Sequence, residues 1–299
     1  MSRSALLSML LACSSFIPLV GAEEIYDLRP AAGFLQLPPG LELGACAAVA
    51  VGGKGEIYLF HRGERPILCF DGQGEFLRGW GDDVIDTAHG LRLDGEGNLW
   101  ATDMAQHRVF KFDPQGKLLL SLGTGRPGDG PDQFNKPTDI AFGARGAVFI
   151  SDGYGNSRVM KFTPGGRLIK SWGVRGKGKG EFHLPHSIVV DRQGRLLVGD
   201  RENDRIQVFD QEGALLDVWN GFAPYGLALD AEGNVFVADG RANQVLRLDA
   251  SGKVVRRWGE KGSGLGQFLM PHMLCFDRQG DLLVAEVGGK RLQKLKRVQ

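Results

Sequence analysis

The chain has 299 residues, of which 42% are hydrophobic and 24% charged, so it can bury a substantial core and is neither disordered nor fibrous. Its 36 Lys plus Arg nearly balance 35 Asp plus Glu, which argues against nucleic acid or an anionic membrane as a partner. The 45 glycines follow no collagen period. They indicate tight turns between short strands, and we therefore expect an all-β fold.

The N-terminal segment has the features of an export signal. A lone Arg3 precedes an apolar stretch that ends in the small residues Val20-Gly21-Ala22. The stretch is too short for a comfortable membrane span. We expect residues 1–22 to be a signal peptide and the mature chain, 23–299, to be periplasmic or secreted, without a transmembrane segment. Leu10-Leu11-Ala12-Cys13 loosely resembles a lipobox, so a lipoprotein anchored at Cys13 is the alternative.

The rest of the chain repeats one pattern. Each copy has an alternating apolar strand, a glycine turn, a second apolar strand that ends in an acid, and then a third and usually a fourth strand. A degenerate copy around residues 55–70 precedes five clear ones and makes six units. Equivalent first-strand positions lie 39 to 49 residues apart, the period of four-stranded propeller blades. The clear copies begin at Ala88, Pro137, Pro185, Pro224 and Pro271.

This period predicts a single six-bladed β-propeller over residues 23–299. The sixth unit has only three strands before the chain ends. We expect Gly33 to Leu37 to supply the fourth strand and close the ring, which leaves no free edge there. Glycine linkers of the form G-x-G-x-G-x-F, as in Gly262 to Phe268, resemble those of NHL repeats.

Residues that recur in the units are expected to be structural, and residues that break the pattern are candidates for function. The recurrent residues are acids at the end of the second strand and arginines at the start of the third. We expect them to brace turns and blades. The acids are Asp103, Asp152, Asp200, Asp239 and Glu286, and the arginines are Arg108, Arg158, Arg205 and Arg291.

The clearest break occurs in the first strands, where histidine stands in every second unit, at His89, His186 and His272. Each blade of a six-bladed ring turns about 60°, so these three side chains should converge on the axis. Three imidazoles suit a zinc ion with an open fourth position. The alternative is that they line a polar pore. His61, His107 and His183 fall outside this position, and we expect them in loops or at the surface.

A second break follows the second strand. Arginine stands there only in units one and four, as Arg62 and Arg201, and Tyr154 lies one place further in unit three. The turns should roof one face of the ring above the histidines. Two guanidiniums and a phenol could hold a carboxylate and supply a base. Because both residue types are common in turns, a purely structural role is the alternative.

Several stretches resemble the peptidyl-α-hydroxyglycine α-amidating lyases. The likeness covers most of the mature chain and includes FHRG from Phe60, SDGYGNSR from Ser151, LPHS from Leu184, DRENDRIQ from Asp200 and MPH from Met270. This family has a six-bladed NHL-type propeller with zinc held by three histidines. The resemblance implies that His89, His186 and His272 are zinc ligands, Tyr154 the base, Arg62 and Arg201 substrate-handling residues, and Met270 a neighbour of the metal.

The chain also departs from this family. An Asp that contributes to the family's structural calcium site is replaced by Met273, which argues against calcium here. The cysteine that follows the family's tyrosine is replaced by Gly155, so its disulfide is not expected. We expect the cysteines of the mature chain, Cys46, Cys69 and Cys275, to be buried thiols.

These observations favour an exported zinc lyase that cleaves a carbinolamide N–C bond of a peptide or small molecule, giving an amide and glyoxylate. One alternative is a non-catalytic NHL propeller that binds a peptide or envelope partner and uses zinc as an axial staple. Such a scaffold has no need of the two arginines and the tyrosine above the metal. A further alternative is a lactonase-like hydrolase, which would prefer carboxylate and Asn ligands to three histidines.

Overall fold

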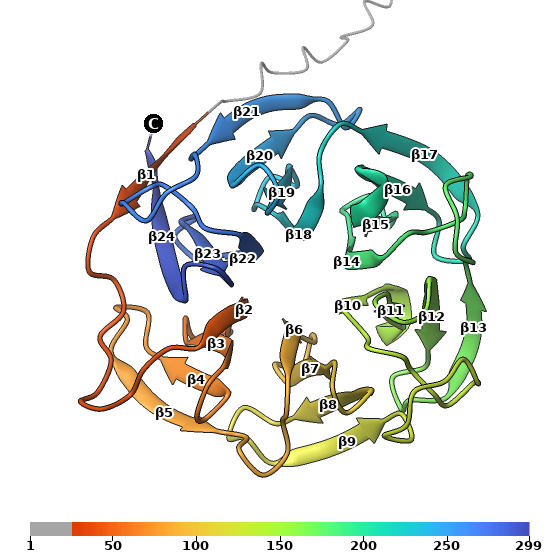
Figure 1. Ribbon diagram of the computed structural model, residues 1–299, viewed down its shortest axis with the longest axis horizontal. Helices are drawn as coiled ribbons and strands as arrows, with labels where there is room; N and C mark the ends of the chain where they lie inside the picture. The colour runs from red at the N-terminus through yellow and green to blue at the C-terminus, as the bar shows by residue number, and fades with distance from the viewer. Residues whose placement is uncertain (1–25, 299) are drawn as a thin grey trace, which may run out of the picture.

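The computed structural model describes residues 26–298, which form six four-stranded antiparallel sheets around one axis (Figure 1). The all-β, six-bladed propeller is therefore confirmed. Helical structure in these residues is limited to two single 3-10 turns, η1 Ala144–Gly146 and η2 Arg201–Asn203. Across residues 26–298, no helix has the length and apolar character needed to span a membrane. The predicted signal peptide, 1–22, and the alternative lipid site at Cys13 lie outside the described residues.

In the first five blades the strands follow chain order from the axis to the rim. Blade one holds β2 Ala45–Val51, β3 Ile57–Arg62, β4 Ile67–Phe70 and β5 Phe76–Trp80, and blade two holds β6 Ala88–Leu93, β7 Leu99–Asp103, β8 Arg108–Phe112 and β9 Leu118–Leu122. Blade three holds β10 Asp139–Phe142, β11 Val148–Asp152, β12 Arg158–Phe162 and β13 Leu168–Trp172. Blade four holds β14 Pro185–Val190, β15 Leu196–Asp200, β16 Arg205–Phe209 and β17 Leu215–Asn220. Blade five holds β18 Pro224–Leu229, β19 Val235–Asp239, β20 Gln244–Leu248 and β21 Val254–Trp258.

Blade six joins the two ends of the described chain. Its strands are β22 Pro271–Phe276, β23 Leu282–Glu286, β24 Arg291–Val298 and, at the rim, β1 Asp27–Ala31. Closure by an N-terminal segment is confirmed, but the choice of Gly33 to Leu37 was wrong. Burial explains the difference, since Tyr26 and Leu28 pack into the cluster between blades five and six, whereas Phe34 and Leu35 pack against blade one.

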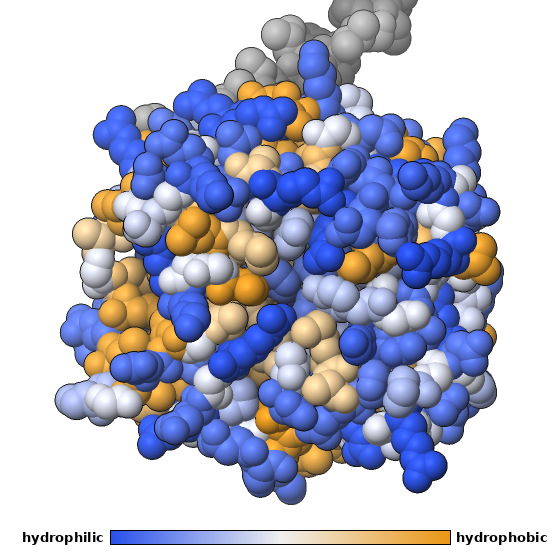
Figure 2. All heavy atoms as spheres, viewed as in Figure 1, coloured by the Kyte–Doolittle hydropathy of each residue, from blue (hydrophilic) through white to orange (hydrophobic). Residues whose placement is uncertain are grey.

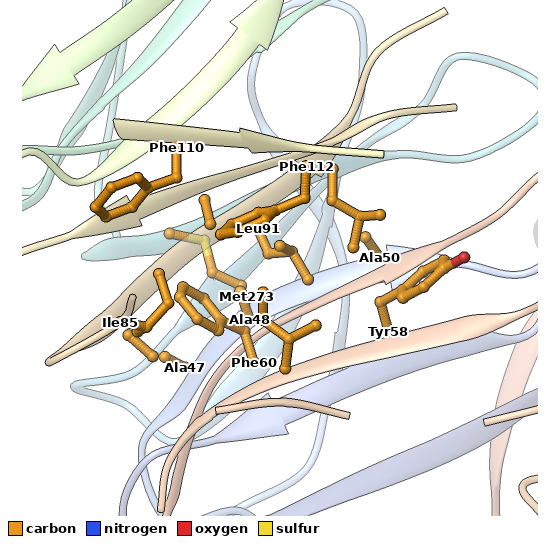
Figure 3. Close-up of a cluster of buried hydrophobic side chains, with 14 of the residues drawn as sticks. Ala47, Ala48, Ala50, Tyr58, Phe60, Ile85, Leu91, Phe110, Phe112 and Met273 are labelled. Carbon is orange, nitrogen blue, oxygen red and sulfur yellow. The ribbon is translucent and has the colours of Figure 1, made fainter. Parts of the chain in front are cut away.

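The core lies between the blades rather than in one central layer. Second strands are buried along their whole length, as in β7 and β15, while rim strands such as β9 alternate between exposed and half-buried residues. One apolar cluster joins blades one and two through Phe60, Leu91 and Phe110, and Met273 enters it from blade six (Figure 3). Polar and charged residues cover most of the face seen in Figure 2, and apolar ones appear there in scattered groups.

Short Asp-Gly turns connect the strands. In blade two, Asp113 Oδ1 accepts hydrogen bonds from the amides of Gln115 and Lys117, both at 2.9 Å. The intervening Gly116 has a φ of 93°, a left-handed conformation that favours glycine. The same Asp-x-x-Gly turn recurs in other blades, for example at Gly74, Gly194 and Gly280.

Candidate metal centre and active site

The candidate histidines lie at irregular points of three innermost strands. The pairing register slips between Ala88 and Leu91 in β6, between Pro185 and Ser187 in β14, and between Pro271 and Leu274 in β22. Each slip contains the histidine. A β-bulge re-aims a side chain that a regular strand would leave in the sheet pattern. The same slip occurs in β2 and β18, so the backbone irregularity is shared by five blades and the histidines use it in three.

The three imidazoles meet at the axis. His89, His186 and His272 are 0%, 0% and 2% exposed, and one ligand atom from each lies within 4.8 Å of the others. Their ring centroids are 4.6 to 4.8 Å apart. The predicted convergence from alternate blades is present.

Each imidazole is oriented by the next blade. Nδ1 of His89 lies 2.7 Å from the carbonyl oxygen of Thr138, and the corresponding distances are 2.6 Å from His186 to Tyr225 and 2.6 Å from His272 to Ala47. A carbonyl oxygen can only accept, so each Nδ1 carries the proton and each Nε2 presents a lone pair. Such outer contacts fix both the tautomer and the ring direction of metal-ligating histidines.

The electrostatics favour neutral imidazoles. Burial lowers the pKa of His89 and of His186 well below the usual value, and the neighbouring imidazoles and Arg201 act in the same direction. Burial, with Arg62 and Arg201 adding to it, lowers the pKa of His272 to about 3.

The donor set therefore fits a soft-to-borderline cation. Nε2 of His89 and Nε2 of His186 are 3.1 Å apart, and with both Nδ1 atoms protonated these are two lone pairs facing each other. A cation between the three nitrogens would relieve that repulsion. Three neutral imidazole nitrogens with no carboxylate among them match an open zinc site.

The three intervening blades place other side chains in the gaps between histidines. Tyr154, which follows β11 in blade three, has its hydroxyl oxygen 3.3 Å from His89 Nε2 and 3.0 Å from His186 Nε2. Arg201 Nη1 donates to the same hydroxyl at 3.3 Å. The predicted base position is thus in direct contact with two of the candidate metal ligands.

Arg62 comes from the end of β3 in blade one. Its Nε donates to the carbonyl of Ala88 at 3.0 Å, and neither Nη atom makes a hydrogen bond within residues 26–298. Burial lowers the pKa of Arg62, and its charge acts on His89 and His272. It therefore presents an unused guanidinium edge close to the imidazoles.

His61 holds the turn that carries Arg62. Its ring contacts the amide of Gly44 at 3.0 Å and the carbonyl of Arg65 at 3.2 Å, and the residue is 0% exposed. The expectation of a surface or loop role for His61 was therefore wrong. The sequence does not distinguish the two environments, because a single histidine at the end of an apolar strand fits a buried position as well as an exposed one.

Arg201 is held on three sides. Its Nε donates to Glu202 Oε1 at 2.8 Å, and its guanidinium carbon lies 5.4 Å from the ring centre of Tyr154 and 4.6 Å from that of Tyr225. Burial opposes the charge, but the two phenols and Glu202 raise the pKa of Arg201. Tyr225 occupies the first-strand position of blade five and was not singled out from the sequence.

The departures from the family pattern have packing explanations. A side chain at Gly155 would approach the Asn135 amide to about 2.0 Å, so Asn135 fills the space next to Tyr154. Cys46 and Cys69 are buried and Cys275 is half-buried, all three as free thiols, which confirms in part the expectation of buried thiols.

Met273 is 2% exposed among apolar side chains (Figure 3). Whether calcium binds stays a prediction. Met270, two residues before His272, is 40% exposed, and its proximity to a metal stays a prediction.

The other end of the innermost strands has a different character. All six strands line a cavity of about 330 Å³ there, mainly with apolar side chains. Arg92, its charged exception, donates to both carboxylate oxygens of Asp139 at 3.0 and 2.7 Å and to the carbonyl of Leu227 at 3.0 Å. The ion pair links blades two and three, and the hydrogen bond to Leu227 adds blade five. Within the described residues, a cluster of groups able to bind a metal occurs only at the histidine end.

Comparison with known proteins agrees with the fold. The NHL repeat family model matches residues 182–209, which include three strands of blade four. NHL repeat-containing protein 3 of Mus musculus is 34% identical over 279 residues, covering 84% of this chain and 79% of that protein. Peptidyl-alpha-hydroxyglycine alpha-amidating lyase 2 of Drosophila melanogaster is 30% identical over 292 residues, covering 82% and 69%.

A longer relative matches part of the chain. Peptidylglycine alpha-amidating monooxygenase of Rattus norvegicus is 37% identical over 207 residues, which cover 57% of this chain and only 21% of the rat protein. Among solved structures, a streptogramin B lyase superposes with a TM-score of 0.67 at 16% identity, covering 91% of this chain and 98% of that one. This last likeness shows the fold alone. From the fly and mouse relatives, the chain belongs to the NHL-repeat propeller family that includes the peptidyl-α-hydroxyglycine α-amidating lyases.

Proposed function

We propose that the protein is a zinc-dependent lyase that cleaves the N–C bond of a carbinolamide and releases an amide and glyoxylate. The observation that carries the proposal is the contact of one phenol, Tyr154, with two of three converging neutral imidazoles and with Arg201. The kinship with amidating lyases supports the same reaction class.

His89, His186 and His272 would hold the metal. Bound zinc would supply Lewis acidity at the substrate hydroxyl through the position that three imidazoles leave open. The carbonyls of Thr138, Tyr225 and Ala47 hold the Nδ1 side of each ring, which keeps the three Nε2 atoms available to a metal.

Tyr154 would act as the base in its phenolate form. Its oxygen accepts the proton of the substrate hydroxyl, and Arg201 Nη1 stabilises negative charge on that oxygen. The O–H bonding pair forms the new C=O bond, and the C–N pair leaves with nitrogen. The proton then passes from Tyr154 to nitrogen, so atoms and charge balance.

The arginines would bind the carboxylate of the substrate. The Nη atoms of Arg62 and Nη2 of Arg201 make no hydrogen bonds to any of residues 26–298. Guanidinium edges of this kind suit a carboxylate, which they can contact through two parallel hydrogen bonds. An axial zinc staple in a scaffold would leave these donors without a role.

The test is turnover of N-benzoyl-α-hydroxyglycine by the zinc-loaded protein, with glyoxylate and benzamide measured together. We expect the two products in equal amounts, loss of both after chelation, and recovery with zinc. A folded, zinc-loaded protein that releases no glyoxylate from this compound or from a peptidyl-α-hydroxyglycine would favour the scaffold alternative.

We also propose that the chain is exported and that residues 1–22 are removed. The support is the charged start, the apolar stretch and the small residues before Glu23. N-terminal sequencing of material from outside the cytoplasm should find a start near Glu23. A lipid-modified start at Cys13 would replace this version, and an uncleaved cytoplasmic chain would refute both.

A further inference from the structure

Tyr225 lies beside two of the candidate metal ligands and has no role in the proposed reaction. It lies in β18 of blade five, where the pairing register slips between Pro224 and Gly226, as it does around the histidines. Its ring centre is 5.3 Å from that of His186 and 6.1 Å from that of His272. Tyr225 thus fills the gap between blades four and six, as Tyr154 fills the gap between blades two and four.

The neighbouring blade backbone makes room for this ring. An added Cβ at Gly240, the residue after β19, would lie 2.6 Å from Cγ of Tyr225 and 2.9 Å from the carbonyl oxygen of Pro271. Any larger residue at 240 would therefore force the ring or the backbone to move. The ring occupies a place that the glycine keeps open.

The contacts of Tyr225 with other side chains run through its ring and not through its hydroxyl. The hydroxyl makes no hydrogen bond to any residue between 26 and 298. The ring, in contrast, lies 4.6 Å from the guanidinium carbon of Arg201, closer than the 5.4 Å to the ring of Tyr154. Guanidinium groups stack favourably on aromatic faces at such distances.

The remaining contacts of Arg201 leave one edge free. Glu202 takes Nε and the Tyr154 hydroxyl takes Nη1, which fixes two directions in the guanidinium plane. Those two contacts alone still permit the plane to tilt, because Glu202 is itself shared with Arg241 at 3.2 Å on the exposed side. The face of Tyr225 removes this freedom and leaves Nη2 directed away from both partners.

We propose that Tyr225 is a positioning residue, whose ring holds the Arg201 guanidinium in the plane that receives the substrate carboxylate. This inference rests on the proposed carboxylate-binding role of Arg201. The ring, and not the hydroxyl, provides the effect. Losing a stacking contact at a partly desolvated site should weaken carboxylate binding by about tenfold.

The test compares Tyr225→Leu with Tyr225→Phe. Phenylalanine keeps the stacking face, so the Kd for a carboxylate ligand and the KM for the lyase substrate should stay within about twofold of wild type. Leucine should raise both constants about tenfold. Zinc content should be unchanged in both variants, because the hydrogen bond that orients His186 is to the backbone carbonyl of residue 225, which both variants keep. If phenylalanine is as harmful as leucine, the hydroxyl carries the effect and the proposal is wrong.

A binding measurement separates this proposal from the lyase proposal. Calorimetric titration of zinc-loaded protein with N-benzoylglycine, which has the carboxylate but no hydroxyl to react, should show the tenfold loss in Tyr225→Leu. The same titration with the uncharged N-benzoylglycinamide should show no difference between variants. An equal effect on both ligands would overturn the positioning role, even if the wild-type lyase activity is present. A carboxylate-specific effect without any turnover would retain the positioning role and remove the proposed reaction.

Two further variants protect the test against a folding artefact. Gly240→Ala should displace the Tyr225 ring and reproduce the carboxylate-specific loss without changing any side chain of the site. Tyr26→Leu removes a ring whose centre lies 3.9 Å from the guanidinium carbon of Arg297. Tyr26 immediately precedes β1, the rim strand of blade six. The substitution should lower thermal stability and leave N-benzoylglycine affinity unchanged. A similar affinity loss in Tyr26→Leu would attribute the effect to general loosening and contradict the proposal.

Discussion

Asp200 and Arg201 are consecutive in the chain but belong to two different systems. Asp200 is buried and accepts a hydrogen bond from Arg205 Nε at 2.8 Å, and the same arrangement recurs between Glu286 and Arg291 at 2.6 Å. Among the six units, only the first also has an arginine at the position of Arg201, namely Arg62. Arg201 points toward the axis, where it contacts Tyr154. The repeated system, an acid paired with an arginine, braces blades three, four and six, whereas the non-repeated system brings side chains from several blades together at the axis. Repetition in this sequence therefore marks bracing contacts, and departures from it mark the side chains that meet at the axis.

The largest effect should come from removing one metal ligand. His186→Ala should reduce zinc from about one ion per chain to near none and lower turnover by about 10³-fold or more, because Lewis-acid stabilisation of several kcal/mol is lost. Elemental analysis and the glyoxylate assay measure both. His183→Ala, three residues earlier in the same blade, is the matched control and should retain zinc. Full zinc occupancy in His186→Ala would break the assignment of the site.

Tyr154→Phe tests the proposed base and leaves the three histidines in place. The ring and its packing remain, so zinc content should stay near one per chain, while turnover should fall by about 10² to 10⁴. The measurement is kcat at saturating substrate with zinc determined on the same sample. Unchanged turnover would remove Tyr154 from the chemistry.

Arg291→Ala addresses the repeated system. It leaves Glu286 buried and without its cation, which should cost about 3 kcal/mol of folding free energy and lower Tm by roughly 6–12 °C. Denaturation monitored by circular dichroism measures this loss. The KM and kcat of the folded fraction should be unchanged. A selective kinetic defect without destabilisation would blur the distinction between the two systems.

Arg62→Ala is the counterpart in the non-repeated system. Removing a guanidinium that binds the carboxylate should raise KM by about 10- to 100-fold, the value of a hydrogen bond to a charged group. Thermal stability should change little, because within residues 26–298 its one side-chain hydrogen bond is to Ala88. A fall in Tm with unchanged kinetics would make Arg62 a brace for its turn.

The smallest effect should be the response of Met273→Asp to calcium. A carboxylate placed among the apolar side chains around Met273 costs stability, and added calcium should recover a few degrees of Tm in the variant and none in wild type. Thermal denaturation with calcium or chelator measures the difference. If calcium stabilises wild type as well, the argument from Met273 fails.

The periodicity was sufficient to predict the blades and the alternation of histidines, because a repeat aligned to itself exposes any column that differs. It was not sufficient to choose the closing strand. Residues 27–31 and 33–37 are both short segments able to pair, and only the burial of Tyr26 and Leu28 between blades five and six separates them. That burial depends on the assembled ring.

The sequence predicts which side chains meet at the axis but not how they are oriented. The bulges around the histidines and the carbonyl acceptors of their Nδ1 atoms are backbone features that side-chain identity does not encode. Tyr225 occupies the same first-strand position as His186, but a tyrosine there does not by itself indicate a role. Its importance depends on Arg201, which comes from a different blade and a different strand.

The central claim is that three alternate blades bring their imidazoles to one zinc ion with a position left for substrate. Anomalous diffraction at the zinc edge from crystals of the zinc-loaded protein tests this directly. We predict a single strong axial peak about 2.0–2.1 Å from the Nε2 atoms of His89, His186 and His272, with no protein atom as the fourth ligand. A peak elsewhere, or a fourth protein ligand that closes the coordination, would contradict the account.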